Sequence, residues 1–181
     1  MNRAQFEHVI RAASEIVGGE MVVIGSQAIL ASFPDAPADL LRSMEADVYP
    51  RAATTPEGLI DGAIGDGSYF HDSFGYYAHE VGPETVIGPA GWEDRLVRLE
   101  AVARVGSQRP SVAWCLEPHD LVLAKLAAGR GRDWEFAAEA IRAQLVDPTT
   151  LRKRAALMPT VVRDAVRARL DGAISRGMST G

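Results

Sequence analysis

Two short stretches, Met21-Val22-Val23-Ile24-Gly25-Ser26 and Glu45-Ala46-Asp47-Val48-Tyr49-Pro50, carry the strongest structural signal in the chain. The first is an uninterrupted apolar run that closes on Gly25-Ser26, which predicts a strand buried on both faces and ended by a turn. The second stretch alternates so that a strand would place Glu45, Asp47 and Tyr49 on one face. We therefore expect a small sheet that directs two carboxylates to the same side.

Patterns on either side of these strands predict the remaining elements. Apolar residues at spacings of three and four predict a helix over residues 3–17 that ends at Gly18-Gly19, and a short helix over residues 27–33. Alternation predicts a half-exposed strand over residues 92–102 and a second strand over 112–116, joined through a turn at 106–110 as a hairpin or as neighbours. Helices over residues 118–128, 133–145 and 159–174 would follow. The pattern does not fix the conformation of the aromatic and glycine-rich residues 56–80, within which residues 68–77 fit either a helix or a loop packed near a site.

Together these elements predict an α+β fold, a small mixed β-sheet with flanking helices and a helical C-terminal extension. The length of 181 residues is within the usual range of a single domain. We expect a core over residues 1–118 and a helical region over residues 119–181, and the two can also form one compact domain.

The composition is that of a globular protein, with an apolar fraction of 47% and a charged fraction of 24%. The first residues contain no basic stretch followed by an apolar run, and no apolar run is long enough to span a bilayer. A single cysteine, Cys115, excludes an intrachain disulfide, and its apolar surroundings place it in the core. We expect a cytoplasmic protein with no membrane partner.

Charge is distributed unevenly along the chain. The formal net charge is -5, yet residues 125–181 contain 11 basic and 6 acidic side chains, which leaves about -10 for residues 1–124. A polyanionic partner would dock at the basic end. The alternative interpretation is a set of helices whose arginine faces are simply solvated.

The order of a strand, a Gly-Ser turn that opens a helix, and a second strand with two acids suits phosphate chemistry. Exposed backbone N–H groups and a hydroxyl at the start of a helix bind phosphate oxygens well. Two carboxylates on one strand face can share a hard divalent cation that also bridges to phosphate oxygens. The chemistry predicted is metal-assisted attack of a hydroxyl on an α-phosphate with loss of pyrophosphate.

Residues Val23–Ser26 and Ser43–Val48 resemble the motif of the nucleotidyltransferase superfamily, in which an apolar residue and Gly-Ser precede two acids separated by one apolar residue. More narrowly, the chain resembles the small bacterial nucleotidyltransferases related to the AbiEii and MenT toxins of toxin–antitoxin systems. Arg42 and Ser43 stand before the acids, and residues 119–126 and 132–137 resemble the later motifs of that branch. The similarity covers roughly residues 20–140.

The resemblance implies a role for seven residues. Gly25 and Ser26 would hold the triphosphate of an NTP, with Ser43 as a further nucleotide-binding residue. Glu45 and Asp47 would coordinate Mg²⁺, Lys125 would neutralise phosphate charge, and Asp133 would act as a third acid or general base. Glu45 replaces the more usual Asp, and Glu100 competes with Asp133 because the third carboxylate of the superfamily often comes from a later strand.

Each feature also has a structural interpretation. Ser26 could cap a helix, Glu45 and Asp47 could be a solvated strand face, and Asp133 could cap the helix that starts beside it. Lys125 could be a helix lysine that extends to solvent. We interpret His71, His79 and His119 as surface or core hydrogen-bonding residues, and the aromatic residues of 69–77 as a packing cluster rather than a stack for a base.

The function predicted is Mg²⁺-dependent transfer of an NMP from an NTP to an acceptor hydroxyl. In the toxin-like branch the acceptor would often be the 3′ end of tRNA, and a cognate antitoxin protein would be a partner. A small-molecule acceptor such as an aminoglycoside, or a protein hydroxyl, is equally compatible with the motif. The alternative from another class is a non-catalytic module of the same fold that binds a protein.

Overall fold

The computed structural model describes residues 1–52, 56–101 and 110–178. Its centre is a five-stranded sheet in the order β3-β2-β1-β5-β4. The β1–β5 and β2–β3 pairs are parallel, and the β1–β2 and β4–β5 pairs are antiparallel, so the predicted mixed sheet is confirmed. The strands are β1 (Met21–Val23), β2 (Glu45–Pro50), β3 (Tyr77–Glu80), β4 (Val97–Ala101) and β5 (Ser111–Cys115).

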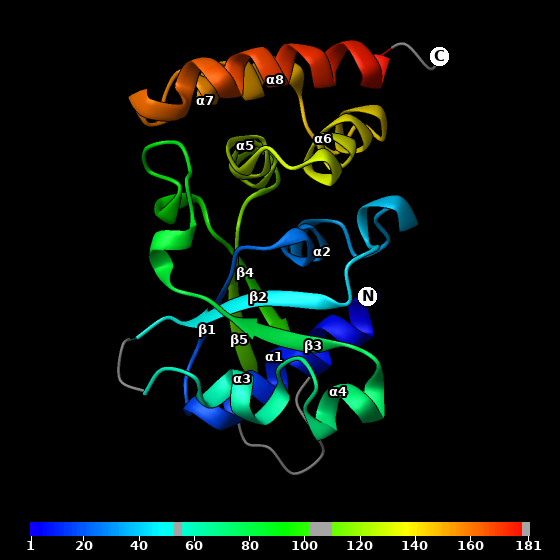
Figure 1. Cartoon of the computed structure of the whole chain (residues 1–181), viewed down its shortest axis with the longest axis vertical. Helices are drawn as coiled ribbons and strands as arrows, with labels where there is room; N and C mark the ends of the chain where they lie inside the picture. Colours follow the sequence, from blue (N-terminus) through cyan, green and yellow to red (C-terminus); the bar gives the residue numbers. More distant parts are fainter. Residues whose placement is uncertain (53–55, 102–109, 179–181) are drawn as a thin grey trace.

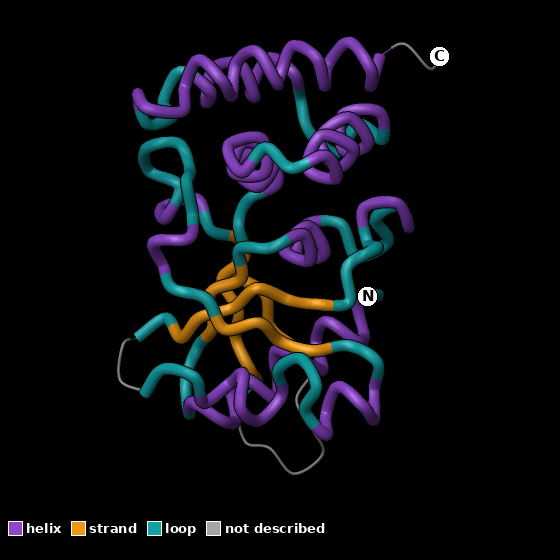
Figure 2. Tube along the Cα trace, in the orientation of Figure 1, coloured by secondary structure: helices purple, strands orange, loops and turns teal. Residues whose placement is uncertain are grey.

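Helices cover both faces of the sheet (Figure 1). On one face lie α1 (Arg3–Val17), α3 (Leu59–Ile64) and α4 (Tyr69–Phe74). The short helix α2 (Ile29–Ser32) lies on the other face, and beyond it the C-terminal helices form two further layers, which Figure 2 shows as the upper half of the molecule. These are α5 (Pro118–Ala128), α6 (Gly131–Arg142), α7 (Pro148–Ala155) and α8 (Thr160–Met178).

The first helix shows how local sequence sets an element. Asn2 caps α1, because its side chain accepts a hydrogen bond from the Gln5 backbone N–H, and Gly18 ends the helix with a φ of 68°. That left-handed conformation favours glycine. Phe6 and Ile10 on the apolar face are fully buried beneath the sheet, so the predicted helix over residues 3–17 is confirmed.

Strands β1 and β2 also match their predictions. All three residues of β1 are buried, as expected for a strand covered on both faces. In β2 the burial alternates, with Ala46 and Val48 fully buried and Glu45 and Asp47 partly exposed on the opposite face. The two acids therefore point away from α1, toward the layer that contains α5 and α6.

Several segments differ from the predictions. Strand β3 and helices α3 and α7 have no counterpart in the predicted elements. The predicted strand over residues 92–102 begins as a 3-10 turn at Glu93–Arg95, and only Val97–Ala101 is a strand. The predicted turn at 106–110 lies, except for Pro110, outside the described residues.

One continuous hydrophobic cluster connects the sheet with the C-terminal helices. It includes Met21 and Val48 from the strands and Leu126 and Leu170 from α5 and α8. Cys115, predicted to lie in the core, is fully buried, and burial raises the pKa of its thiol to about 12. The division at residue 118 stays a prediction. Among the described residues, no helix combines the length and the apolar character needed to cross a membrane.

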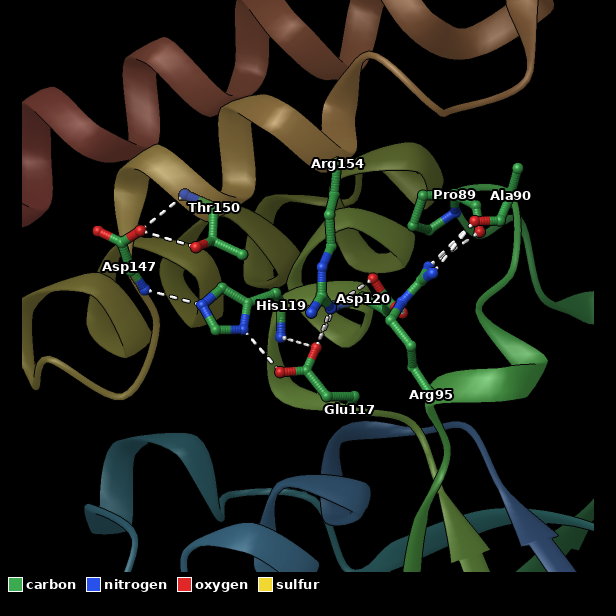
Figure 3. A network of polar contacts seen from close by, with 9 residues as sticks. All are labelled: Pro89, Ala90, Arg95, Glu117, His119, Asp120, Asp147, Thr150 and Arg154. Atoms are coloured by element: carbon green, nitrogen blue, oxygen red, sulfur yellow. Dashed lines mark hydrogen bonds and ion pairs between the residues drawn. The ribbon is translucent and has the colours of Figure 1, made fainter.

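A buried polar network fastens the helical layers to the loop before β4 (Figure 3). Asp120 is fully buried and accepts hydrogen bonds from Arg95 Nε at 2.7 Å and from Arg154 Nη1 at 2.9 Å. Arg154 also forms an ion pair with Glu117, the residue that caps α5. The residues of this network come from three segments: the loop before β4, the start of α5, and α7. The network therefore holds α5 in place relative to the sheet, on the side that the acids of β2 face.

Candidate active site

Two adjoining pockets open between the sheet and helices α5 and α6. Their volumes are about 370 and 350 Å³. Ser26 and Ser43 line the first pocket and Gly25 lines the second. The residues that line both pockets are Glu45, Asp47, Lys125, Arg130, Arg132 and Asp133. The structure thus brings together all seven residues to which the sequence motifs assign a role.

Gly25 and Asp47 approach each other closely. A Cβ atom built on Gly25 would lie 2.1 Å from Asp47 Oδ2, far inside the distance that real atoms allow. The two residues are brought together by the β1–β2 pairing, which continues through a hydrogen bond from Ile24 N–H to the Asp47 carbonyl. Glycine is required here by space and not by backbone conformation, because its φ is an ordinary -80°. The Gly of the motif therefore makes room for the carboxylate of the second acid.

The Gly-Ser turn leads into a shorter helix than predicted. Ser26–Ala28 is a 3-10 turn and α2 adds only Ile29–Ser32, so the dipole of a long helix is not available at Ser26. Behind Ser26, the fully buried Gln27 donates from Nε2 to the Ser43 carbonyl at 2.8 Å. The Ser43 hydroxyl accepts from the Glu45 backbone N–H at 3.2 Å. These contacts fix the entry of β2 beside the turn.

Both acids of β2 receive a hydrogen bond from the neighbouring strand β3. Tyr77 Oη donates to Glu45 Oε2 at 3.1 Å, and His79 Nδ1 lies 3.0 Å from Asp47 Oδ1. Burial and the hydrogen bond to Glu45 raise the pKa of the Tyr77 hydroxyl. The hydrogen bond to Asp47 raises the pKa of His79 against the opposing effect of its partial burial. The raised pKa of Tyr77 and of His79 means that each keeps the proton that it donates to its acid.

On the opposite wall, Lys125 is held between two side chains of α6. Its Nζ lies 3.3 Å from Asp133 Oδ1 and 5.0 Å from the centre of the Phe136 ring. Asp133 is only 4% exposed, and its Oδ2 accepts the Arg130 backbone N–H at 3.1 Å, as in a helix cap. Both carboxylate oxygens of Asp133 thus have partners, an arrangement that favours orientation of Lys125 over metal binding.

Two arginines supply further positive charge at the same wall. Arg130 and Arg132 line both pockets, and in the described part of the chain neither side chain forms an ion pair. Arg42, by contrast, is paired with Asp39 at 2.6 Å and with Glu135 at 3.4 Å. Of the three arginines that line the pockets, Arg130 and Arg132 are therefore the two without an ion pair in the described part of the chain.

Glu100, the alternative third carboxylate, lies elsewhere. It is on β4, at the opposite edge of the sheet from β3, and its Oε1 is 2.5 Å from Arg98 Nη1. It lines neither pocket. Between the two predicted candidates, the structure therefore places only Asp133 at the site.

The donor set suits Mg²⁺ that arrives with a nucleotide. Glu45 and Asp47 offer carboxylate oxygens at the junction of the pockets. Among the described residues, no group of three or more His, Cys, Asp or Glu side chains could hold a metal ion. Mg²⁺ commonly retains several waters and is bound through one or two carboxylates plus substrate phosphates, rather than by a full protein cage. Glu45 and Asp47, which lie opposite the side chains of Arg130 and Arg132, fit this way of binding Mg²⁺ together with a nucleotide.

Four residues of the site have no role in the sequence motifs: Tyr77, His79, Arg130 and Arg132. A signal for the first two is present, because Tyr77 and His79 are two residues apart and would share a strand face, as the two acids do. Their partners become evident only from the pairing of β3 with β2. Of the aromatic residues over 69–77, Phe70, Phe74 and Tyr76 pack around the His8 ring, as the packing interpretation predicts.

Comparison with known proteins identifies the family of the chain. Residues 4–169 match a family described as nucleotidyltransferases of unknown function, DUF6036. Searches of the curated proteins and of the solved structures found no match. The family match covers most of the chain and includes both walls of the site. The chain therefore has an α+β nucleotidyltransferase fold and belongs to the DUF6036 family of nucleotidyltransferases.

Proposed function

We propose that the protein transfers an NMP from an NTP to an acceptor hydroxyl in a Mg²⁺-dependent reaction. The observation that carries this proposal is the placement of Glu45 and Asp47 opposite Lys125, Arg130 and Arg132 across two pockets that share them all. Carboxylates suit the metal, and cations suit the triphosphate that the metal accompanies. The acids alone would not bind the triphosphate, and the basic side chains alone would not bind the metal, so the combination favours a metal–nucleotide complex.

Each wall has a distinct task in the proposed reaction. Glu45 and Asp47 would hold the Mg²⁺, which when bound polarises the α-phosphate as a Lewis acid. Ser26 would donate its hydroxyl hydrogen to a phosphate oxygen beside Gly25. Lys125, oriented by Asp133, would neutralise charge that develops on the departing pyrophosphate. In the reaction the acceptor hydroxyl loses its proton to solvent and its oxygen bonds to the α-phosphorus. The bond between the α-phosphorus and the oxygen that bridges to the β-phosphate breaks, and pyrophosphate leaves.

The two pockets offer separate places for two substrates. The second pocket has apolar lining from Val81, Val86 and Leu116, whereas the first is lined mainly by charged side chains. Both meet at Glu45 and Asp47. A donor nucleotide and an acceptor could thus approach the same carboxylates from two sides, as a transfer between two bound molecules requires.

The acceptor that we propose is the 3′ end of tRNA, with a cognate antitoxin protein as partner, as in the toxin-like branch that the sequence resembles. Arg130 and Arg132 support a polyanionic acceptor, because among the described residues they form no ion pair and they lie beside the site. A cationic acceptor such as an aminoglycoside is the second candidate. It is supported by the acids Asp39, Glu135 and Glu139 at the first pocket, whose ion pairs with Arg42 and Arg142 a polycationic acceptor would have to replace.

The test uses labelled NTPs and Mg²⁺, with total tRNA and an aminoglycoside as separate acceptors. The chain has two lysines, so Lys125→Met can be compared with Lys153→Met on the exposed side of α7 as a matched control. We expect transfer to tRNA to fall about 100-fold in Lys125→Met and to remain unchanged in Lys153→Met. The transfer to tRNA should also weaken as salt concentration rises.

Other outcomes would change the proposal in defined ways. Label on the aminoglycoside but not on tRNA would select the small-molecule acceptor. Failure of the wild-type protein to bind any NTP with Mg²⁺ in calorimetry would favour the non-catalytic, protein-binding alternative. Equal transfer by Lys125→Met and the wild-type protein would contradict the assignment of Lys125 to the triphosphate.

A further inference from the structure

Strand β3 carries a row of hydrogen-bond donors in register with the two acids of β2. The parallel pairing places Tyr77 opposite Glu45 and His79 opposite Asp47. Each donor contacts the acid directly across from it, at 3.1 Å for Tyr77 Oη to Glu45 Oε2 and 3.0 Å for His79 Nδ1 to Asp47 Oδ1. Side chains paired in register on one face of neighbouring strands lie close together, so the sheet itself sets these contacts.

The contacts restrain both carboxylates from more than one side. Asp47 lies between His79 at its Oδ1 and the backbone of Gly25 beside its Oδ2. Glu45 has one more rotatable bond than an aspartate, and the Tyr77 hydroxyl holds the end of that longer arm. Tyr77 is in turn packed against the His71 ring, with the ring centres 4.6 Å apart.

The C-terminal end of β3 is also anchored. Asp61 Oδ1 accepts the Glu80 backbone N–H at 2.7 Å, directly after His79 in the chain. The Glu80 side chain accepts the Ile60 backbone N–H at 2.9 Å. Helix α3 therefore fixes the strand that presents the two donors.

We propose that Tyr77 and His79 are positioning residues that orient Glu45 and Asp47 toward a divalent cation, and that Tyr77 compensates for the longer side chain of Glu45. This inference rests on the proposed function, because it assigns the two acids to a metal. Partners that hydrogen-bond to metal-binding carboxylates orient them, and their loss commonly weakens metal binding 10- to 100-fold. His79 acts through Asp47, because its Nδ1 lies 3.0 Å from Asp47 Oδ1.

The experiment measures Mn²⁺ binding to the 181-residue chain by the loss of the free-ion signal in electron paramagnetic resonance, with and without an NTP. Tyr77→Phe removes only the hydroxyl, and His79→Ala removes the imidazole. We expect each to weaken Mn²⁺ binding about 10- to 100-fold. Tyr69→Phe, at a side chain that is 87% exposed on α4, is the matched control and should bind as the wild-type protein does.

Two further variants separate positioning from a general structural effect. His79→Asn keeps a nitrogen one bond beyond Cγ, where Nδ1 stands, and should restore binding to within a few-fold of wild type. In a Glu45→Asp background the shortened arm no longer reaches Tyr77, so Tyr77→Phe should add less than about a twofold loss. Transfer activity of Tyr77→Phe should recover as Mg²⁺ is raised, which a damaged fold would not allow.

Wild-type Mn²⁺ affinity in both Tyr77→Phe and His79→Ala would overturn the positioning role alone. The positioning role is also overturned if His79→Asn binds as weakly as His79→Ala, or if Tyr77→Phe costs as much with Asp at position 45 as with Glu. Absence of Mn²⁺ binding by the wild-type protein, with and without NTP, would instead overturn the proposed function and the positioning role together.

Discussion

At the scale of single residues, the close approach of Gly25 and Asp47 explains why the motif requires glycine at position 25. The position that a Cβ of residue 25 would take lies 2.1 Å from Asp47 Oδ2. The Asp47 side chain cannot rotate away from Gly25 without cost, because its other oxygen, Oδ1, is hydrogen-bonded to His79 Nδ1. A larger residue at position 25 must therefore displace the carboxylate that the proposed reaction needs.

Gly25→Ala is expected to lower nucleotidyl transfer about 100-fold, because a displacement of about 1 Å in a reacting group has that order of effect. Steady-state transfer rates measure the loss, and circular dichroism shows whether the sheet is retained. Gly19→Ala is the matched control: a Cβ there would meet nothing within 4 Å, and it should leave transfer unchanged. Full activity in Gly25→Ala would contradict the shared space.

Local motifs predict one part of the site, and tertiary pairing determines the other. Gly25, Ser26, Glu45 and Asp47 are close in sequence and lie on or beside two strands that pair, so the sequence alone brings them together. The hydrogen bonds from Tyr77 and His79 to the acids depend on the pairing of β3 with β2. The availability of Arg130 and Arg132 depends on which arginines form ion pairs in the folded protein. Neither property is encoded within a short stretch.

At the scale of elements, the start of α5 depends on a charged cap. Glu117 accepts the backbone N–H groups of His119 and Asp120 and also contacts the His119 ring and Arg154 (Figure 3). Burial opposes ionisation of Glu117, but His119 and Arg154 outweigh it and lower its pKa to about 2, from an ordinary value of 4.5. The carboxylate thus stays charged in the folded protein under conditions where it would be protonated in the unfolded chain.

Because the folded pKa is depressed, Glu117 stabilises the protein fully above pH 4.5 and loses that contribution as the pH falls toward 2. Glu117→Gln keeps an oxygen for the cap but removes the charge, and it should lower the free energy of unfolding by about 2 kcal/mol near neutral pH. Urea unfolding across pH measures the difference, which should shrink below pH 4.5.

Asp164→Asn, at an exposed acid of α8, is the control and should change the free energy of unfolding by less than about 0.5 kcal/mol. A difference between wild type and Glu117→Gln that grows as the pH falls below 4.5 would contradict the depressed pKa.

The elements that the sequence does not reveal are short and owe their stability to neighbours. Strand β3 has four residues, of which only Ala78 is fully buried, and its pairing with β2 replaces the missing hydrophobic pattern. Helix α7 buries only Leu151 and Ala155, although the Asp147 cap and Pro148 at its first turn are start signals. Helix α1, with a long apolar face and a cap at each end, is fully predictable.

At the scale of the whole molecule, the basic C-terminal region is mostly used within the fold. Arg169 Nη1 donates to the Leu126 carbonyl at the end of α5 at 2.6 Å, and Arg163 Nε donates to the Met158 carbonyl at 2.9 Å. Arg154 lies in the buried network and Arg152 pairs with Asp171. A count of charges in the sequence cannot tell arginines that make contacts within the fold from arginines that are exposed to a ligand. A polyanion at the site would therefore meet Arg130 and Arg132, which line the pockets, rather than these four arginines.

The sheet order separates the two acids Asp47 and Glu100. Asp47 is on β2 beside β1, where it lines both pockets, whereas Glu100 is on β4 at the far edge and lines neither. Both are carboxylates on strands, so a pair of isosteric amide variants tests the location of the active site with little change in shape.

The decisive comparison is between Asp47→Asn and Glu100→Gln in labelled NMP transfer with Mg²⁺. If Glu45 and Asp47 form the catalytic centre, Asp47→Asn lowers transfer by at least about 100-fold and Glu100→Gln retains the wild-type rate. Transfer that survives Asp47→Asn, or that is lost in Glu100→Gln instead, would contradict a catalytic centre at the acids of β2.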